Sequence, residues 1–128
     1  MTNTQKSKDL LRVVAIFPDL PAFEGVLGSD LKSMQRAVGG LIEVTYPFQD
    51  SAILLGNEEA KLRGMPGNRR IGREVYAGPL FVIGDTGGSD FCSLSDKQIT
   101  LYCQRFAQPE GISDEEVQDD LRSGFIIW

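Results

Sequence analysis

Residues 41–55, LIEVTYPFQDSAILL, decide the fold class because they contain two strand patterns in direct succession. From Ile42 to Tyr46, apolar and polar residues alternate, which is typical of a strand that is buried on one face. The second half, SAILL at residues 51–55, is a short apolar run and indicates a further strand. Two strands separated by only a few residues favour an antiparallel pair.

Further elements are predicted on both sides of this pair. The predicted strands are residues 11–17, 41–48, 51–55, 75–83 and 91–94, and the predicted helices are residues 30–38, a segment opened by the capping box of Ser95 and Gln98, and residues 114–122. Residues 18–28 contain two prolines and two glycines and are predicted to form a loop, and Gly56-Asn57 a turn. Gly78-Pro79 interrupts the strand at 75–83, which suits a bulge or an edge position. This order predicts an α+β fold, a single small domain with a mostly antiparallel sheet of about five strands and two to three helices.

The chain of 128 residues, 41% of them hydrophobic, has the composition of one soluble domain. We expect a disordered N-terminal segment at residues 1–10, the α+β domain at 11–107, and an acidic helix with an apolar tail at 108–128. No apolar run approaches the length of a membrane span and no secretory leader is evident, so we expect a cytoplasmic protein with no membrane partner. Cys92 and Cys103 are expected to be free thiols.

Charge is distributed unevenly along the chain. The formal net charge of −5 arises entirely within residues 108–128, because acidic and basic residues balance over residues 1–107. A neutral body argues against nucleic acid as a partner. The exception is residues 61–73, KLRGMPGNRRIGR, which contain five cations and no acid.

This Gly/Arg segment has no clear period, and we interpret it as a long loop or one short helical turn. Glycines expose backbone N–H groups and arginines offer forked donors that match phosphate oxygens, so the segment is a candidate anion site. The predicted ligand-binding residues are Arg63, Gly67, Asn68, Arg69, Arg70, Arg73 and Tyr76. The alternative is a solvated charged loop that binds nothing.

Residues for catalysis are scarce. The chain has no histidine, which removes the commonest general base and the commonest metal ligand. We therefore predict no catalytic residue, no metal site and no cofactor. An enzyme is the minor alternative, a metal-dependent phosphodiesterase in which Glu58, Glu59 or Asp85 would bind Mg²⁺.

Four stretches in this order carry a family resemblance. They are MQRAVGGLIE at 34–43, NEEAKL at 57–62, MPGNRR at 65–70 and GPLFVIGDTGGSDFCSLSDKQI at 78–99. Over about residues 12–106 the chain resembles the domain of unknown function 3846, found in small proteins of bacteria, phages and mobile elements. Ala60 stands where the family pattern has a glycine. The resemblance implies the fold and a phage or mobile-element setting, and it supplies no catalytic residue.

Two functions from different classes follow. In the first, the protein is a non-catalytic small-ligand-binding module that sequesters a nucleotide-like anionic signal, an anti-defence role in the host cytoplasm. In the second, it is a protein-interaction module that inhibits or regulates a host protein through residues 108–128, which contain the acidic helix and the apolar end Phe125–Trp128. The apolar end and an edge strand also favour a homo-oligomer.

Overall fold

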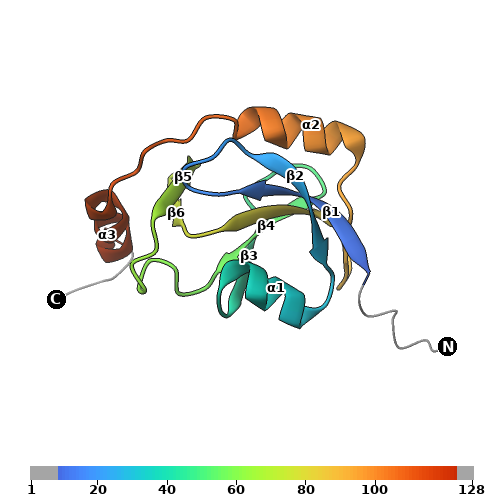
Figure 1. The fold of residues 1–128 in the computed structure, drawn as a ribbon, viewed down its shortest axis with the longest axis horizontal. Helices are drawn as coiled ribbons and strands as arrows, with labels where there is room; N and C mark the ends of the chain where they lie inside the picture. The colour runs from blue at the N-terminus through green and yellow to red at the C-terminus, as the bar shows by residue number, and fades with distance from the viewer. Residues whose placement is uncertain (1–8, 124–128) are drawn as a thin grey trace.

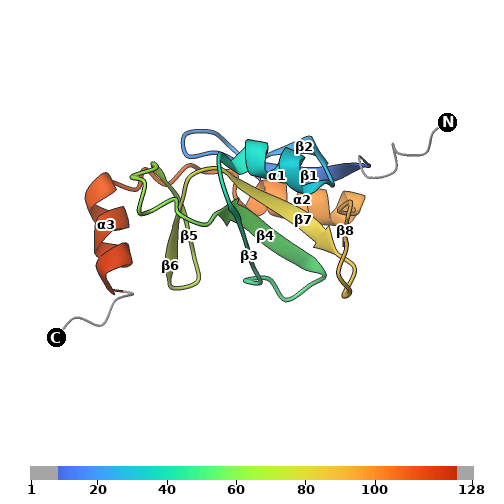
Figure 2. The same ribbon diagram turned by 90° about the horizontal axis from the view of Figure 1, so that it is seen from below.

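The structure is a computed structural model that describes residues 9–123, and its centre is an antiparallel sheet. The strands of this sheet are β1 (Leu10–Ile16), β2 (Phe23–Gly28), β3 (Ile42–Thr45), β4 (Ala52–Asn57), β7 (Leu80–Asp85) and β8 (Phe91–Cys92). They are ordered β2-β1-β7-β4-β3, and β8 pairs with β7 (Figure 1; β7 and β8 are labelled in Figure 2). The α+β prediction is confirmed.

Alternating side chains give the sheet two apolar faces. On one face, Met34 and Val38 of α1 (Leu31–Val38) pack against residues such as Val13 and Ile53. On the other face, α2 (Asp96–Arg105) packs against residues such as Val14. The two helices therefore lie on opposite sides of the sheet, as Figure 1 shows.

A second, two-stranded sheet stands beside the first. It is the hairpin of β5 (Gly67–Ile71) and β6 (Glu74–Ala77), and α3 (Asp114–Ser123) packs on its outer side (Figure 2). A small apolar cluster that includes Val75, Ile112 and Val117 joins hairpin and helix.

The three predicted helices are confirmed, and side-chain caps are seen at the starts of α1 and α2. The Asp30 side chain accepts a hydrogen bond from Ser33 N at the start of α1, and Gly39 ends that helix with a left-handed φ of 82°. At α2, Ser95 and Gln98 form the predicted capping box.

Two loop predictions between residues 18 and 57 are wrong. Residues 23–28 form β2, which pairs with β1 over six residues at the sheet edge, where Gly25 is tolerated opposite Val13. Gly56-Asn57 is not a turn but the end of β4, because Asn57 is still paired with Ile42 of β3. Long-range pairing outweighed local propensity at both places.

The Gly/Arg segment is also more regular than predicted. Instead of a loop, its second half forms the β5–β6 hairpin, which Gly72 closes with a left-handed φ of 63°. The predicted break at Gly78-Pro79 separates β6 from β7, as expected. However, β7 is not an edge strand, because it lies between β1 and β4, and so it offers no free edge for a homo-oligomer.

The predictions for the chain ends are only partly within the described residues. Leu10 begins β1 and pairs with Gly28, so it does not belong to a disordered segment as predicted; residues 1–8 lie outside the described part. The predicted tail Phe125–Trp128 also lies outside it. Between residues 9 and 123, no helix has the length and apolar character to cross a membrane.

Gly84 of β7 and Gly88 of the turn that follows it allow a matched test of packing. A Cβ at Gly84 would lie 2.8 Å from the backbone oxygens of Cys92 and Ser93, whereas at Gly88 the nearest atom, Thr86 Oγ1, would be 3.7 Å away. We predict that Gly84→Ala lowers the free energy of unfolding by about 1–3 kcal/mol in urea titrations. Gly88→Ala is the control, and an equal loss in both variants would contradict the packing shown here.

Candidate functional site

Arg69, a predicted ligand residue, is fully buried. Its Nη2 donates to the carbonyl oxygens of Leu20 and Phe106, both at 2.8 Å, and its Nη1 donates to that of Phe17 at 3.3 Å. These bonds tie β5 to the segment after β1 and to the end of α2. Desolvation by burial lowers the pKa of Arg69, but a guanidinium remains charged in proteins. The side chain is therefore a structural cation and does not face a ligand.

Asn68 has a similar structural role. Its buried Nδ2 donates to the carbonyl oxygens of Ile16 at 2.8 Å and Gly78 at 2.7 Å, while its Oδ1 accepts from Arg69 Nη1 at 2.9 Å. Gly67 is buried below α3, where an added Cβ would lie 2.6 Å from Ile112 Cγ2. The prediction that these residues contact a ligand is corrected, because their polar groups are used inside the protein.

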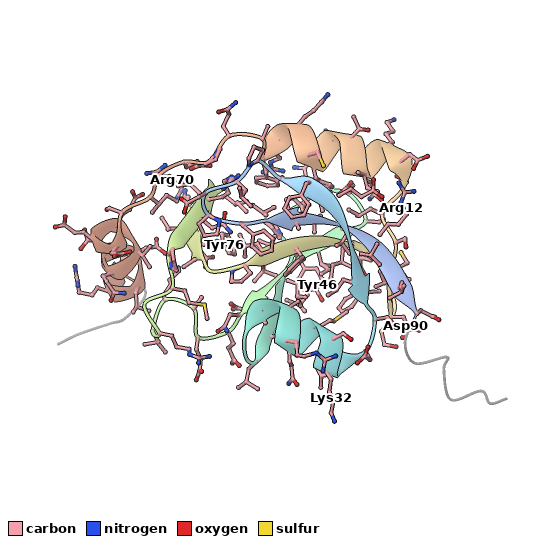
Figure 3. The ribbon with its side chains drawn as sticks, in the orientation of Figure 1. Arg12, Lys32, Tyr46, Arg70, Tyr76 and Asp90 are labelled. Carbon is pink, nitrogen blue, oxygen red and sulfur yellow. The ribbon has the colours of Figure 1, made fainter. Side chains whose placement is uncertain are left out.

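The exposed arginines do not form one cationic site: Arg70 and Arg73 line a shallow surface pocket that also contains the carboxylates of α3, while Arg63 lies at the end of α1. Arg70 binds Glu116 in a bidentate ion pair, with Nε–Oε2 2.7 Å and Nη2–Oε1 2.6 Å, and binds Glu110 at 3.0 Å. Figure 3 shows Arg70 beside the connection between α2 and α3. Arg63 donates to the carbonyl oxygen of Gly39 at 3.1 Å and so caps the end of α1. Arg73 is exposed at the hairpin turn. The structure does not assemble the predicted residues into one anion site.

The predicted acidic helix uses its charges mainly within the chain. Glu116 pairs with Arg70, Asp120 with Lys61, and Asp119 with Arg122. The hydrogen bonds from Arg70 lower the pKa of Glu116. The Glu116–Arg70 pair fastens α3 to the hairpin and the Asp120–Lys61 pair fastens it to the segment after β4, whereas Asp119–Arg122 lies within the helix. Most carboxylates of α3 thus have intramolecular partners.

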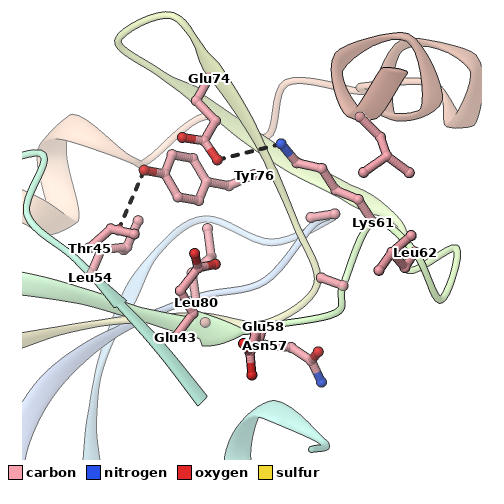
Figure 4. Close-up of a pocket in the computed structure, with 14 residues that line it drawn as sticks. Glu43, Thr45, Leu54, Asn57, Glu58, Lys61, Leu62, Glu74, Tyr76 and Leu80 are labelled. Atoms are coloured by element: carbon pink, nitrogen blue, oxygen red, sulfur yellow. Dashed lines mark hydrogen bonds and ion pairs between the residues drawn. The ribbon is translucent and has the colours of Figure 1, made fainter. Parts of the chain in front are cut away.

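Tyr76 leads to a different candidate site, a pocket of about 190 Å³ between the hairpin and the β3–β4 edge of the main sheet. We call it the hairpin pocket (Figure 4). Its floor is apolar and buried, formed by Leu54, Ala60, Ala77 and Leu80. Leu54 and Leu80 lie on the face of the main sheet that also packs against α2. The pocket occupies the part of that face that the hairpin covers instead of α2.

The register of β3 and β4 creates this space. Glu43 is paired with Gly56, and Thr45 with Leu54. Because Gly56 has no side chain, the volume between Glu43 and Leu80 stays open; a Cβ at Gly56 would lie 3.1 Å from Leu80 Cδ2. Gly56 thus sets the depth of the pocket.

Polar groups surround the apolar floor. Tyr76 Oη lies 3.4 Å from Thr45 Oγ1, and Lys61 Nζ lies 3.5 Å from Glu74 Oε2 and also pairs with Asp120 of α3. Figure 4 shows the Glu43 and Glu74 carboxylates on different sides of the pocket, one from β3 and the other from β6. The remaining carboxylate of the lining is Glu58.

The carboxylates influence one another. Burial raises the pKa of Glu43, and the negative charges of Glu74 and Glu58 raise it further, while Lys61 acts in the opposite direction. Burial also raises the pKa of Tyr76, so its phenol stays protonated at neutral pH. The pocket therefore presents negative charge, the neutral hydroxyl groups of Tyr76 and Thr45, and an apolar surface.

Most residues of this pocket could not be identified from the sequence. Of its polar groups only Tyr76 was predicted as a ligand residue, and Glu58 was assigned to a metal-dependent alternative. Glu43 was visible as a polar position in an alternating strand, but only the pairing with Gly56 and the placement of the hairpin make it part of a pocket.

The phosphodiesterase alternative finds no assembled acidic cluster. Glu58 directly follows the last residue of β4. Asp85 is the last residue of β7 and lies beside the start of β4, where its N–H donates to Ser51 O, so the two carboxylates are at opposite ends of β4. Glu59 does not line the pocket. Within residues 9–123, no three His, Cys, Asp or Glu side chains are grouped so as to hold a metal ion.

A family model described as Domain of unknown function (DUF3846) matches residues 11–107. The chain belongs to this family. The DUF3846 region includes both sheets, α1 and α2, and it ends before α3. It also supplies the whole floor of the hairpin pocket and its three lining carboxylates. The chain matches no curated protein and no solved structure.

Neighbouring arginines of β5 provide a test of the two roles assigned here. We predict that Arg69→Lys lowers the free energy of unfolding by about 2–4 kcal/mol, because one ammonium cannot replace the donors to three carbonyl oxygens in two separate segments. The control, Arg70→Lys, removes an exposed bidentate pair and should cost no more than about 1 kcal/mol. Urea titrations measure both values, and a larger loss for Arg70→Lys would overturn the assignment.

The raised pKa of Glu43 makes a prediction about pH. When a carboxyl group has a higher pKa in the folded state than in the unfolded state, the folded protein loses stability as the pH rises from the ordinary pKa through the raised pKa. Glu43→Gln, which carries no charge, should therefore raise Tm relative to the natural protein at about pH 7 and leave it nearly unchanged at about pH 4. Thermal unfolding followed by circular dichroism tests this, and a lower Tm at neutral pH would refute it.

Proposed function

We propose that the protein is a small-ligand-binding module that holds its ligand in the hairpin pocket without converting it. The observation that carries this proposal is the combination of a buried apolar floor with several polar groups at the rim, the composition of small-molecule sites in general. The pocket lies in the DUF3846 part of the chain, apart from Leu121 on α3.

Two features of the lining support binding rather than catalysis. Among the described lining residues there is no serine or cysteine, and the chain contains no histidine to serve as a general base. Lys61, the one amine of the lining, pairs with Glu74 and Asp120, so its charge is engaged. A binder of this kind acts by occupancy alone, which suits sequestration of a signal in the phage or mobile-element setting implied by the family resemblance.

The chemistry of the ligand differs from the sequence-based expectation. The expectation of a nucleotide-like anion rested on the arginines of the Gly/Arg segment, of which Arg69 is buried and Arg70 is paired with carboxylates. The hairpin pocket instead carries three carboxylates and one ammonium. The ligand screen therefore includes cationic compounds, and nucleotides are included to test the sequence-based expectation.

The test is a thermal-shift screen of the full chain with AMP, cyclic di-AMP, ADP-ribose, small amines and amino acids. A ligand at about 100 times its Kd stabilises the folded state by about 2.7 kcal/mol, which is readily detected. Compounds that raise Tm are then titrated into ¹⁵N-labelled protein, and we expect amide shifts at residues 43–45, 54–62 and 74–77.

Gly56→Val is the matched pocket variant, because its side chain extends toward Leu80 into the open volume. Gly88→Val, with open space around its Cβ, is the control. We predict that Gly56→Val abolishes binding while Gly88→Val retains it; Gly56→Ala serves if the valine variant does not fold. A flat screen, or shifts centred on Arg63 and Arg73, would refute the proposal.

A further inference from the structure

We infer that the ligand of the hairpin pocket is a small aliphatic ammonium ion, such as a diamine, held between Glu43 and Glu74 above the apolar floor. This inference rests on the proposed function and specifies the chemistry of its ligand. It follows from the charge and size of the hairpin pocket, from its apolar floor and from the partners of its lining carboxylates.

Charge is the first argument. The carboxylates of Glu43 and Glu58 have no hydrogen-bond or ion-pair partner among the described residues. The neighbouring cation, Lys61, forms its ion pairs with Asp120 of α3 and, at 3.5 Å, with Glu74, and none with Glu43 or Glu58. A cationic ligand would supply an ion-pair partner for these two carboxylates.

The placement of the carboxylates is the second argument. Glu43 comes from β3 and Glu74 from β6, so their negative charges approach from different elements (Figure 4). Their mutual repulsion is part of what raises the pKa of Glu43. An ammonium group between them would donate to both, and charge-assisted hydrogen bonds of this type are the strong ones.

The floor of the pocket is the third argument, and it selects an organic cation over a metal ion. Leu54, Ala77 and Leu80 offer contact to methylene groups but no oxygen ligand. The half-buried ring of Tyr76 adds a surface to which an ammonium is attracted. An alkyl chain with a terminal ammonium matches both surfaces.

Size is the fourth argument. The volume of about 190 Å³ lies below the range of roughly 300–1,000 Å³ that is usual for pockets that hold drug-sized ligands. A short diamine suits this volume better than a nucleotide does.

The test uses 1,4-diaminobutane, with 1,4-butanediol and succinate as neutral and anionic probes of similar length. Each is titrated calorimetrically into the full chain near physiological salt, which suppresses weak attraction to the acidic protein as a whole. Glu43→Gln removes one carboxylate of the pocket. Glu59→Gln removes an exposed carboxylate outside the pocket and is the matched control for net charge.

We expect the diamine alone to bind, its affinity to fall by at least about tenfold in Glu43→Gln, and Glu59→Gln to leave it within about twofold. Equal losses in the two variants would mean nonspecific attraction and would overturn the inference. If butanediol or succinate binds the pocket more tightly than the diamine, the ligand class is wrong while the proposed function stands. If none of the probes moves the amide resonances of the pocket, the inference fails, and the nucleotide arm of the screen then decides the proposed function separately.

Discussion

The guanidinium group of Arg69 joins three parts of the chain that are distant in sequence. It donates to carbonyl oxygens in the segment after β1 and at the end of α2, while the side chain itself belongs to β5. Burying this charge is tolerable because its Nη donors meet carbonyl oxygens. Asn68 extends the connection to Ile16 and Gly78. Within residues 9–123 no strand ladder links the hairpin to the main sheet, so these bonds hold the two together along with the packing of Ile71 and Tyr76 against the core of the main sheet.

The hairpin pocket depends on this connection. Its floor and Glu43 belong mainly to the main sheet, whereas Tyr76 and Glu74 belong to the hairpin, and the space between them exists only while the two sheets keep their relative placement. Arg69 thus acts on the pocket as a positioning residue. On the outer side of the hairpin, α3 adds Leu121 to the lining and draws Lys61 away through Asp120. A segment outside the DUF3846 match therefore contributes to the charge of a pocket that is otherwise formed within it.

The sequence predicted the helices and the antiparallel class well because their signals are local. Asp30, Ser95 and Gln98 cap helices through contacts within four residues, and the alternation from Ile42 to Tyr46 requires no knowledge of the partner strand. The Gly/Arg segment shows where such reasoning ends. A count of cations does not distinguish Arg69 from Arg70, yet on a strand adjacent side chains point to opposite faces, and one is fully buried while the other is exposed. The pocket could not be predicted either, since it requires the pairing of Glu43 with Gly56 and the position of the hairpin.

The central claim is that Arg69 is an internal structural cation rather than a ligand contact, and NMR of its side chain tests it most directly. In ¹⁵N-labelled protein, the guanidinium N–H resonances of Arg69, assigned by comparison with Arg69→Lys, should exchange slowly with water and stay unchanged when AMP is added. Those of exposed Arg73 should exchange rapidly. Fast exchange at Arg69, or a shift of its resonances on addition of the nucleotide, would contradict the claim.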